Sequence, residues 1–225
     1  MHKIRTTTFM LLCVAILGIS TGCSDNKDST YPSVVLEFLT VQTSSTGEMK
    51  TALLDSGEKY DILQDESEFK SSPDTTLRMV AYYDKEFADG KKGVHIYGAT
   101  QAVSPIPKPL DKFEDDIFTD PVNLISLWQG FYYINLIVEV KMQAKKHRFH
   151  FIERQNTIDL QTKTRSVDLQ IYHDSQNDLP AYSSRGYLSI PMEQYLQNDV
   201  QKVLITLNIT NYNGENLQRQ IAYIP

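Results

Sequence analysis

The sequence is poor in cysteine and tryptophan and has no long hydrophobic run. Its 225 residues include two cysteines, Cys13 and Cys23, and one tryptophan, Trp128. If the chain is cut before Cys23, as argued below, the remaining part has no thiol pair. A disulfide framework and a cysteine-based metal site or nucleophile are then excluded. Stability must come from core packing.

Recognisable catalytic motifs are also missing. The sequence has no Gly-x-Ser-x-Gly, no phosphate-cradling glycine-rich loop and no His-Glu-x-x-His. His147 and His150 come nearest to a metal pair, but residues three apart on a strand point to opposite faces. Phe149 and Phe151 favour a strand there, so we expect solvated strand histidines. We predict a non-enzyme with no catalytic residue, metal or cofactor.

The first 22 residues differ from the rest of the chain. A basic head with His2, Lys3 and Arg5 precedes the apolar residues 9–19. As a helix at ~1.5 Å per residue, this run would span about 16 Å, too little for a hydrocarbon core ~30 Å thick. Such a head, a short apolar stretch and small residues after it are typical of a secretory signal. We predict that residues 1–22 are a signal peptide.

The end of this segment predicts lipid attachment. Ser20-Thr21-Gly22-Cys23 resembles the bacterial lipobox, in which the cysteine begins the mature chain and carries acyl chains such as palmitate. The usual aliphatic residue is replaced by Ser20, with Ile19 one position earlier. Because each buried CH₂ contributes ~0.8 kcal/mol, two or three long chains on Cys23 would anchor the protein stably in a membrane.

A flexible tether is predicted over residues 23–32. Residues 24–30 contain no apolar side chain and cannot bury enough surface to fold. This serine- and acid-rich stretch resembles the surface-export signal of lipoproteins from Bacteroides-type bacteria, and a plain spacer facing the periplasm is the alternative. We expect an outer-membrane lipoprotein of the cell envelope, exposed at the cell surface.

Net charge argues against a nucleic-acid partner. Without Lys3 and Arg5, 20 basic residues remain against 28 acidic ones, a net charge of −8. An acidic protein repels phosphate, and the one dense basic cluster, residues 145–148, reads as a hairpin tip.

Residues 33–102 are predicted to form a small barrel. Short apolar or alternating runs indicate strands at 34–41, 51–54, 59–63, 77–83 and 94–98. Asp55-Ser56-Gly57 indicates a hairpin turn between the second and third of them. Five strands in roughly 70 residues fit an OB-like barrel.

Residues 103–125 are predicted to be a stiff linker. Pro105, Pro107 and Pro109 alternate there and an acidic run follows at 114–116. Proline at this density cannot occupy a central strand. A helical turn is predicted at 123–129.

An antiparallel β-sandwich is predicted over residues 126–225. In 132–142 one face is apolar and the other is polar apart from Ile137. Similar signals at 148–152, 167–171, 186–190, 203–209 and 218–223 bring the count to about six strands. A short helix is expected at 191–197. The fold class is therefore all-β.

Two features raise the question of ligands. Residues 173–178 are rich in oxygen ligands suited to Ca²⁺, but Asp and Asn are also ordinary turn residues, and we favour turn chemistry. Tyrosine occurs 13 times. Tyr82-Tyr83 and Tyr132-Tyr133 should each expose one ring, which could stack on sugars or bases, although tyrosine also suits any half-buried strand.

The whole chain resembles the NigD-like lipoproteins of Bacteroidales. The resemblance rests on residues 54–60, the strands at 94–98 and 133–142, Tyr172-His173-Asp174 with Asn177-Asp178, and residues 186–191. It implies an amino-terminal OB-like domain, a carboxy-terminal β-sandwich domain and an envelope location. The family name comes from a bacteriocin-associated operon, and the resemblance carries over no catalytic residue.

Three functions stay open at this point. We expect a binding or interaction module that meets a glycan, a peptide or a protein partner. An accessory or protective protein of a bacteriocin-type operon is the first alternative. A cryptic envelope hydrolase, whose residues converge only in the fold, is the second.

Overall fold

The computed structural model describes residues 34–88, 90–113 and 117–225. Ser33–Pro225 cluster into one compact unit. The predicted signal peptide, the tether and Cys23 lie outside the described residues.

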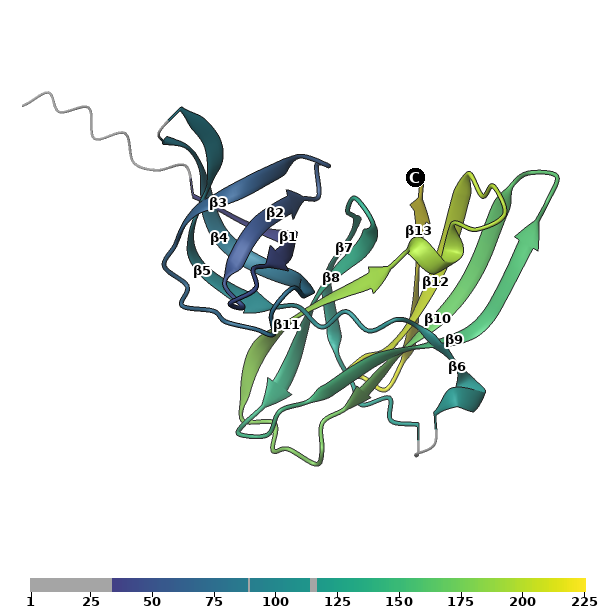
Figure 1. Cartoon of the computed structure of the whole chain (residues 1–225). Helices are drawn as coiled ribbons and strands as arrows, with labels where there is room; N and C mark the ends of the chain where they lie inside the picture. Colours follow the sequence, from purple (N-terminus) through teal and green to yellow (C-terminus); the bar gives the residue numbers. More distant parts are fainter. Residues whose placement is uncertain (1–33, 89, 114–116) are drawn as a thin grey trace, which may run out of the picture. The chain divides into compact units, whose positions relative to one another are not determined.

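The first five strands close into a barrel, coloured purple to teal in Figure 1. Their order around the barrel is β1-β2-β3-β5-β4, and β4 returns to β1. The β3–β5 pair is parallel and the other pairs are antiparallel. The predicted OB-like barrel is confirmed. Its strands are β1 (Val35–Thr43), β2 (Met49–Leu54), β3 (Lys59–Asp65), β4 (Thr76–Ala88) and β5 (Lys91–Gln101).

The barrel is held by side chains that alternate into its interior. Leu39 and Val41 on β1 are fully buried, as are Met79 and Ala81 on β4, because every second residue of a strand faces inward. The predicted hairpin turn is confirmed: Gly57 adopts a φ of +86°, which favours glycine, and its N–H donates to the Leu54 carbonyl at 2.9 Å.

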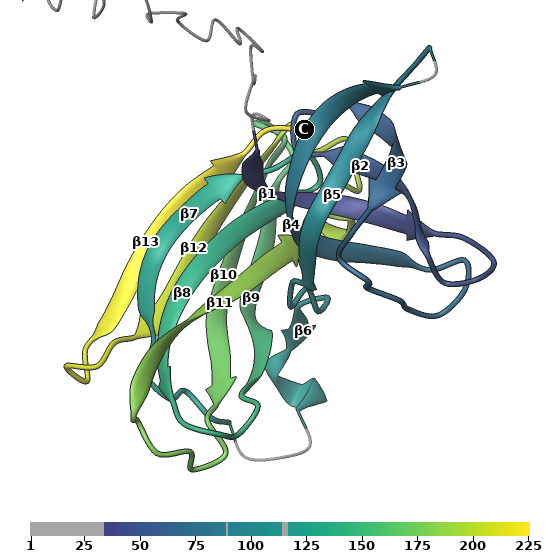
Figure 2. The same cartoon turned by 90° about the vertical axis from the view of Figure 1, so that its left-hand side faces the viewer.

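The remaining strands build two sheets that face each other. A five-stranded sheet has the order β13-β12-β10-β9-β6, and a three-stranded sheet has the order β11-β8-β7. Figure 2 shows β7, β8 and β11 in front of the other layer. The elements are β6 (Lys108–Pro109), β7 (Asn123–Gln129), β8 (Tyr133–Met142), β9 (Arg148–Asp159), β10 (Thr164–Asp174), β11 (Tyr182–Pro191), β12 (Lys202–Thr210), β13 (Asn216–Tyr223) and the 3₁₀ helices η1 (Leu110–Lys112) and η2 (Glu193–Tyr195).

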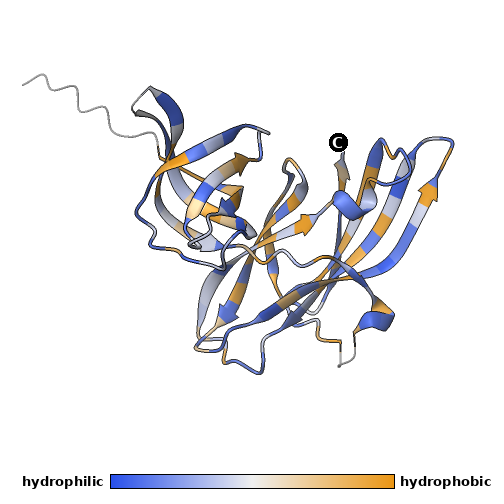
Figure 3. Ribbon diagram, viewed as in Figure 1, coloured by the Kyte–Doolittle hydropathy of each residue, from blue (hydrophilic) through white to orange (hydrophobic). Residues whose placement is uncertain are grey.

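Alternating side chains fill the space between these sheets. Figure 3 shows apolar and polar bands succeeding one another along the strands. The enclosed core includes Leu136 and Val138 of β8, Leu169 of β10 and Leu207 of β12. This confirms the predicted sandwich, and η2 lies within the predicted short helix.

Among the named strands that the structure describes, the pairs of the sandwich are antiparallel except for two. β10 and β12 run parallel because the chain leaves this sheet after β10 to form β11 in the other one, and then returns in the original direction. β6 also runs parallel to β9. Neither parallel pair could be predicted from the sequence, because the alternation within one strand does not show which strand it pairs with or in which direction.

The predicted helical turn at 123–129 is wrong, because these residues form strand β7. The register of β7 against β8 shifts between Leu124 and Ser126. A bulge inserts one unpaired residue and reverses the facing of everything after it. Regular alternation is therefore lost in the sequence although the strand is present.

The segment predicted as a linker is in contact with the sandwich. Lys108 and Pro109 pair with β9 at the edge of the five-stranded sheet, a position where proline is tolerated. Phe113 stacks on Tyr172 at 5.6 Å between ring centroids. Further along, the Val122 N–H donates to the Thr210 carbonyl.

Candidate functional site

An apolar cleft of about 260 Å³, called the aromatic cleft below, lies where the barrel meets the outer face of the three-stranded sheet. Phe38 and Val80 of the barrel are buried there, and Trp128, Ile137 and Tyr187 of the sheet pack against them. The Phe38 ring meets Trp128 edge-on at 5.4 Å and Tyr187 edge-on at 6.0 Å between centroids. Such edge-to-face pairs stabilise an aromatic cluster beyond area burial alone.

Strand pairing brings the sheet side of the cleft together. Ile137 lies directly opposite Tyr187 in the β8–β11 register, and Trp128 lies opposite Asn135 in the β7–β8 register. Ile137 is the one apolar exception on the polar face of β8, and it contributes to this second packing surface. The barrel side comes from Leu36 and Phe38, two residues apart on β1.

Beneath the cleft, a buried polar network joins the barrel to the sheet. The Arg78 guanidinium on β4 donates from Nη2 to the two Asp55 carboxylate oxygens at 2.7 and 2.6 Å, and to Asn135 Oδ1 at 2.9 Å. Arg78 Nε donates to Ser189 Oγ at 3.2 Å, and the Asn135 amide donates back to Asp55 at 2.6 Å. The Arg78 side chain is 2% exposed and that of Asp55 19%.

Aromatic rings complete the surroundings of Arg78. Its Cζ atom lies 4.1 Å from the centroid of the Tyr133 ring and 5.5 Å from that of Phe38. A buried charge is tolerated when its donors are satisfied and it faces π-electrons. The network therefore fixes the floor of the cleft. Asp55, which sequence reasoning assigned only to a turn, lines the cleft as well.

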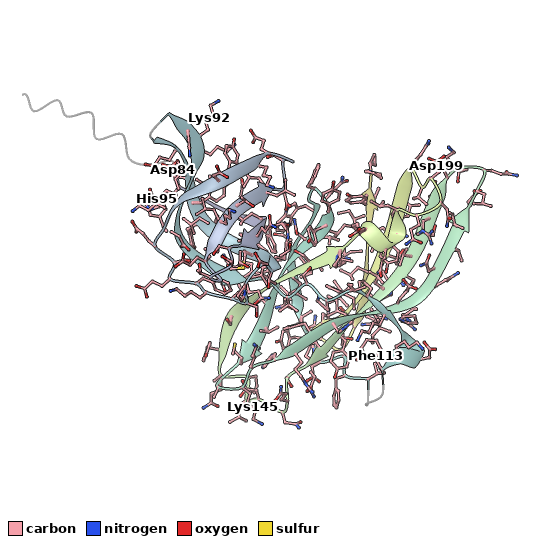
Figure 4. The ribbon with its side chains drawn as sticks, viewed as in Figure 1. Asp84, Lys92, His95, Phe113, Lys145 and Asp199 are labelled. Atoms are coloured by element: carbon pink, nitrogen blue, oxygen red, sulfur yellow. The ribbon has the colours of Figure 1, made fainter. Side chains whose placement is uncertain are left out.

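A second cavity, of about 460 Å³, adjoins the cleft and is acidic. It shares Glu37 and Ser56 with the cleft and is also lined by Glu58, Asp84 and Lys85. Figure 4 labels Asp84 on the barrel.

Burial and hydrogen bonds shift the pKa of two side chains that line this acidic cavity, Tyr83 and Glu58. Glu37 accepts a hydrogen bond from the Tyr83 hydroxyl at 2.7 Å. Burial, and then this bond, raise the pKa of Tyr83 well above its usual value, so the phenol stays neutral. Hydrogen bonds from Lys85, Tyr60 and Ser56 lower the pKa of Glu58 to about 2. Both carboxylates are acceptors, which suits a cationic ligand.

The exposed tyrosines follow the predicted pattern. Tyr82 is exposed while Tyr83 is buried, and Tyr132 is exposed while Tyr133 lies over Arg78. Neither Tyr82 nor Tyr132 lines the aromatic cleft.

The histidines are less solvated than predicted. The His147 side chain is 4% exposed, and its Nδ1 lies 2.9 Å from Nε2 of His173, a residue that the sequence pattern did not pair with it. His150 is half-buried, and that burial lowers its pKa. His147 and His150 are not brought together. Within the described ranges, no group of three or more His, Cys, Asp or Glu is placed to hold a metal ion.

Residues 173–178 form one local turn bond of the expected kind, in which Asp174 Oδ1 accepts the Gln176 N–H at 2.7 Å, and they also form bonds to a neighbouring loop. Asp178 accepts the backbone N–H groups of Gln143, Ala144 and Lys145, and the first of these bonds is the main cause of its lowered pKa. Figure 4 shows Lys145 at this end of the sandwich, opposite the end that carries Asp199. Asp174 pairs with Arg148.

The predicted lipid site, Cys23, lies outside the described residues. In the part of the chain that the structure describes, no helix has the length and hydropathy needed to cross a bilayer.

Comparisons with known proteins bear on the whole described fold. Residues 105–223 match the model of the NigD-like C-terminal β-sandwich domain. A solved NigD-like immunity protein from Bacteroides caccae is 31% identical, with a TM-score of 0.71 over 87% of this chain and 99% of that one. No curated protein matches the sequence.

More distant solved structures share the fold. A protein of unknown function from Bacteroides vulgatus has a TM-score of 0.64 at 14% identity, over 86% of this chain and 92% of that one. A protein described as a candidate lipoprotein from Bacteroides fragilis has a TM-score of 0.57 at 13% identity, over 86% and 98%. With the family model covering more than half of the sequence and the Bacteroides caccae protein covered almost completely, the chain belongs to the NigD-like family.

Proposed function

We propose that the protein is a lipid-anchored, non-catalytic binding module of the bacterial envelope that receives a peptide or protein segment in its aromatic cleft. The observation that carries this proposal is the cleft itself. Exposed clefts with aromatic walls and a few placed polar groups are the usual form of a binding site. Here the walls are Phe38, Trp128 and Tyr187, and the polar groups are Glu37 and Asp55.

The anchor is proposed at Cys23, with the protein on the outer membrane and facing outward. Its support is the signal-like start of the chain, the lipobox-like Gly22-Cys23 and the polar tether that follows. Acyl chains on Cys23 would make the membrane a permanent partner.

An accessory or protective role in a bacteriocin-type operon is the second candidate. It is favoured by the relative from Bacteroides caccae, which is described as a NigD-like immunity protein. The two candidates are compatible, because a protective protein can act by binding a peptide. A gene for a peptide exporter beside this one would favour the protective role, and a glycan-uptake locus would favour another ligand.

Lipidation is tested by metabolic labelling with an alkynyl fatty acid in cells that carry the wild type or Cys23→Ala. We expect label on the wild type and none on the variant, because Cys23 is the proposed acceptor. Protease shaving of intact cells should remove the labelled protein. Label retained in Cys23→Ala would refute the anchor, and labelled protein protected from shaving would place it facing the periplasm.

Binding in the cleft is tested with Trp128, whose emission reports this site alone because the chain has one tryptophan. Blocked tripeptides with a central phenylalanine or leucine should shift this emission, whereas one with a central aspartate should not. Leu36→Lys places a charge in the cleft and should weaken binding at least tenfold. Leu204→Lys is the matched control, since Leu36 is 37% exposed and Leu204, on the sandwich, 38%. Equal weakening by both variants, or no response to any tripeptide, would contradict the proposal.

A further inference from the structure

We propose that the gap beside the first residues of β1 binds an extended cationic peptide as an added β-strand, with apolar side chains entering the aromatic cleft and basic ones entering the acidic cavity. This inference rests on the proposed function, because it assigns a ligand chemistry to the same cleft. Its occupant is a segment of a partner in which apolar and basic residues alternate.

The first residues of β1 have a strand on one side only. β1 pairs with β4 from Val35 to Gln42, but its pairing with β2 begins at Leu39. Among the described residues, 35–38 therefore have no strand partner on their second side, and the part of this edge that is exposed is 35–37, because Phe38 is buried. Val34, Val35 and Leu36 are exposed although they are apolar. A free edge with exposed apolar side chains is the usual template for pairing with another chain.

The two faces of this edge lead into different cavities. Leu36 and Phe38 point to one face and line the aromatic cleft, whereas Val35 lines only the acidic cavity. Glu37 touches both, and its carboxylate is bonded to Tyr83 inside the barrel. The Asp55-Ser56-Gly57 turn forms the opposite wall, since Ser56 lines both cavities.

The two cavities would contact alternate side chains of a strand bound in this gap. Successive side chains of a strand point to opposite faces, so an added strand would send one side chain to each cavity in turn. Main-chain hydrogen bonds then supply affinity, and the pockets for alternate side chains supply specificity. Apolar and basic residues should therefore alternate along the ligand sequence, with a period of two residues.

The negative charge of the acidic cavity favours basic side chains at the ligand positions that enter it. Three carboxylates, those of Glu37, Glu58 and Asp84, line the acidic cavity against one cation, Lys85. Lys85 is already paired with Glu58 at 2.9 Å. A lysine or arginine of the ligand would bring a second cation against the three carboxylates, whereas an acidic residue would be repelled.

The probe is a blocked hexapeptide of alternating phenylalanine and lysine, added to the full mature chain in detergent. The first control is a peptide of the same composition with three phenylalanines followed by three lysines. Two further controls are alternating peptides with N-methyl groups on every second backbone nitrogen, one methylated at the odd positions and the other at the even positions. Two readouts are followed: Trp128 emission, and hydrogen exchange of the amides at 35–38. We expect the alternating peptide to shift the emission and to slow exchange at alternate positions of 35–38. The block peptide and at least one methylated peptide should bind at least tenfold more weakly.

Charge is tested separately. Glu37→Gln keeps an acceptor for Tyr83 but removes the negative charge, and it should weaken the alternating peptide about fivefold, the equivalent of roughly 1 kcal/mol. Raising the salt concentration should weaken the wild type toward the affinity of the variant. Glu193→Gln, an exposed carboxylate on the sandwich, should leave the affinity unchanged.

The outcomes separate this inference from the proposed function. If peptides shift Trp128 emission but both methylated forms bind equally well and exchange at 35–38 is unchanged, strand addition is overturned and binding in the cleft stands. If no peptide shifts the emission, both are overturned. If residues 35–38 are protected without peptide, and deleting residues 24–32 removes that protection, the edge is covered by the tether. Protection that rises with protein concentration would assign it to a second copy, and either result overturns the inference.

Discussion

The His173 imidazole is enclosed at one end of the sandwich. Its Nδ1 faces the Asp120 carbonyl at 3.0 Å, and because a carbonyl only accepts, this nitrogen carries the hydrogen. Nε2 is then the acceptor for His147. Burial, more than the repulsion from His147, lowers the pKa of His173, so the ring is held neutral in the folded protein.

Acidification should therefore destabilise the protein through His173. In the unfolded chain the ring takes up a proton near pH 6.5, while the folded state resists it, so the unfolded state binds more protons below that pH. The free energy of unfolding should fall between pH 7.5 and pH 5.5, a window above the ordinary titration range of the carboxylates. In His173→Gln the fall should be smaller.

Denaturant titrations at the two pH values measure this difference. Gln201→Ala, an exposed position on the sandwich without a titratable group, is the control and should keep the wild-type pH dependence. An unchanged pH dependence in His173→Gln would show that His173 is not responsible, and would point to His150, whose pKa burial also lowers.

The turn between β7 and β8 depends on a close approach that a glycine permits. A Cβ atom at Gly130 would overlap the Asp55 carboxylate and would lie 2.8 Å from the Asn135 amide nitrogen. The Gly130 N–H also closes the turn by donating to the Tyr133 carbonyl at 2.7 Å. This turn therefore brings β8 against the polar network under the cleft.

Gly130→Ala should destabilise the folded protein by about 2 kcal/mol, because the added methyl group overpacks the contact between Asp55 and Asn135. Thermal unfolding measures this loss. Gly98→Ala is the matched control, since a Cβ there meets nothing within 4 Å. An equal loss in the two variants would indicate a general cost of removing glycine from these elements.

The sequence predicted strands where apolar side chains form a short run or alternate clearly with polar ones. β8 was predicted from its apolar face. Ile137, the apolar residue on its otherwise polar face, marks a second packing surface, because it packs in the aromatic cleft. β7 was missed since a bulge between Leu124 and Ser126 breaks the alternation. The role of Arg78 could not be predicted, because the pattern of a single strand does not show that Asn135, 57 positions away, accepts its hydrogen bond.

The barrel and the sandwich should unfold together, and Arg78 is the reason we expect it. Its guanidinium joins Thr40 and Asp55 of the barrel region to Asn135 and Ser189 of the sheet. Arg78→Met should destabilise the protein by about 3 to 5 kcal/mol, because it leaves the Asp55 charge without its partner. We further expect the single transition to broaden or split, as the barrel loses its coupling to the sandwich.

Calorimetry checks both parts of this prediction. Lys85→Met is the control, since the Lys85–Glu58 pair is half exposed and surface pairs contribute little. Arg78→Met and Asp55→Asn combined should cost less than the two single changes added together, because they remove two ends of one interaction. Strict additivity would show that the two residues stabilise the fold independently.

The position of β1 also has a mechanical consequence. Under the proposed anchoring at Cys23, β1 is the first strand that a load on the membrane attachment reaches, and it is also the strand whose edge receives the ligand. A pull along β1 would shear its ladder with β4, which runs from Val35 to Gln42, so its hydrogen bonds would resist together and not open one at a time. Tension between a captured partner and the cell would then load the strand pairs of β1 in shear, first its ladder with β4 and, from Leu39 onward, its ladder with β2 as well.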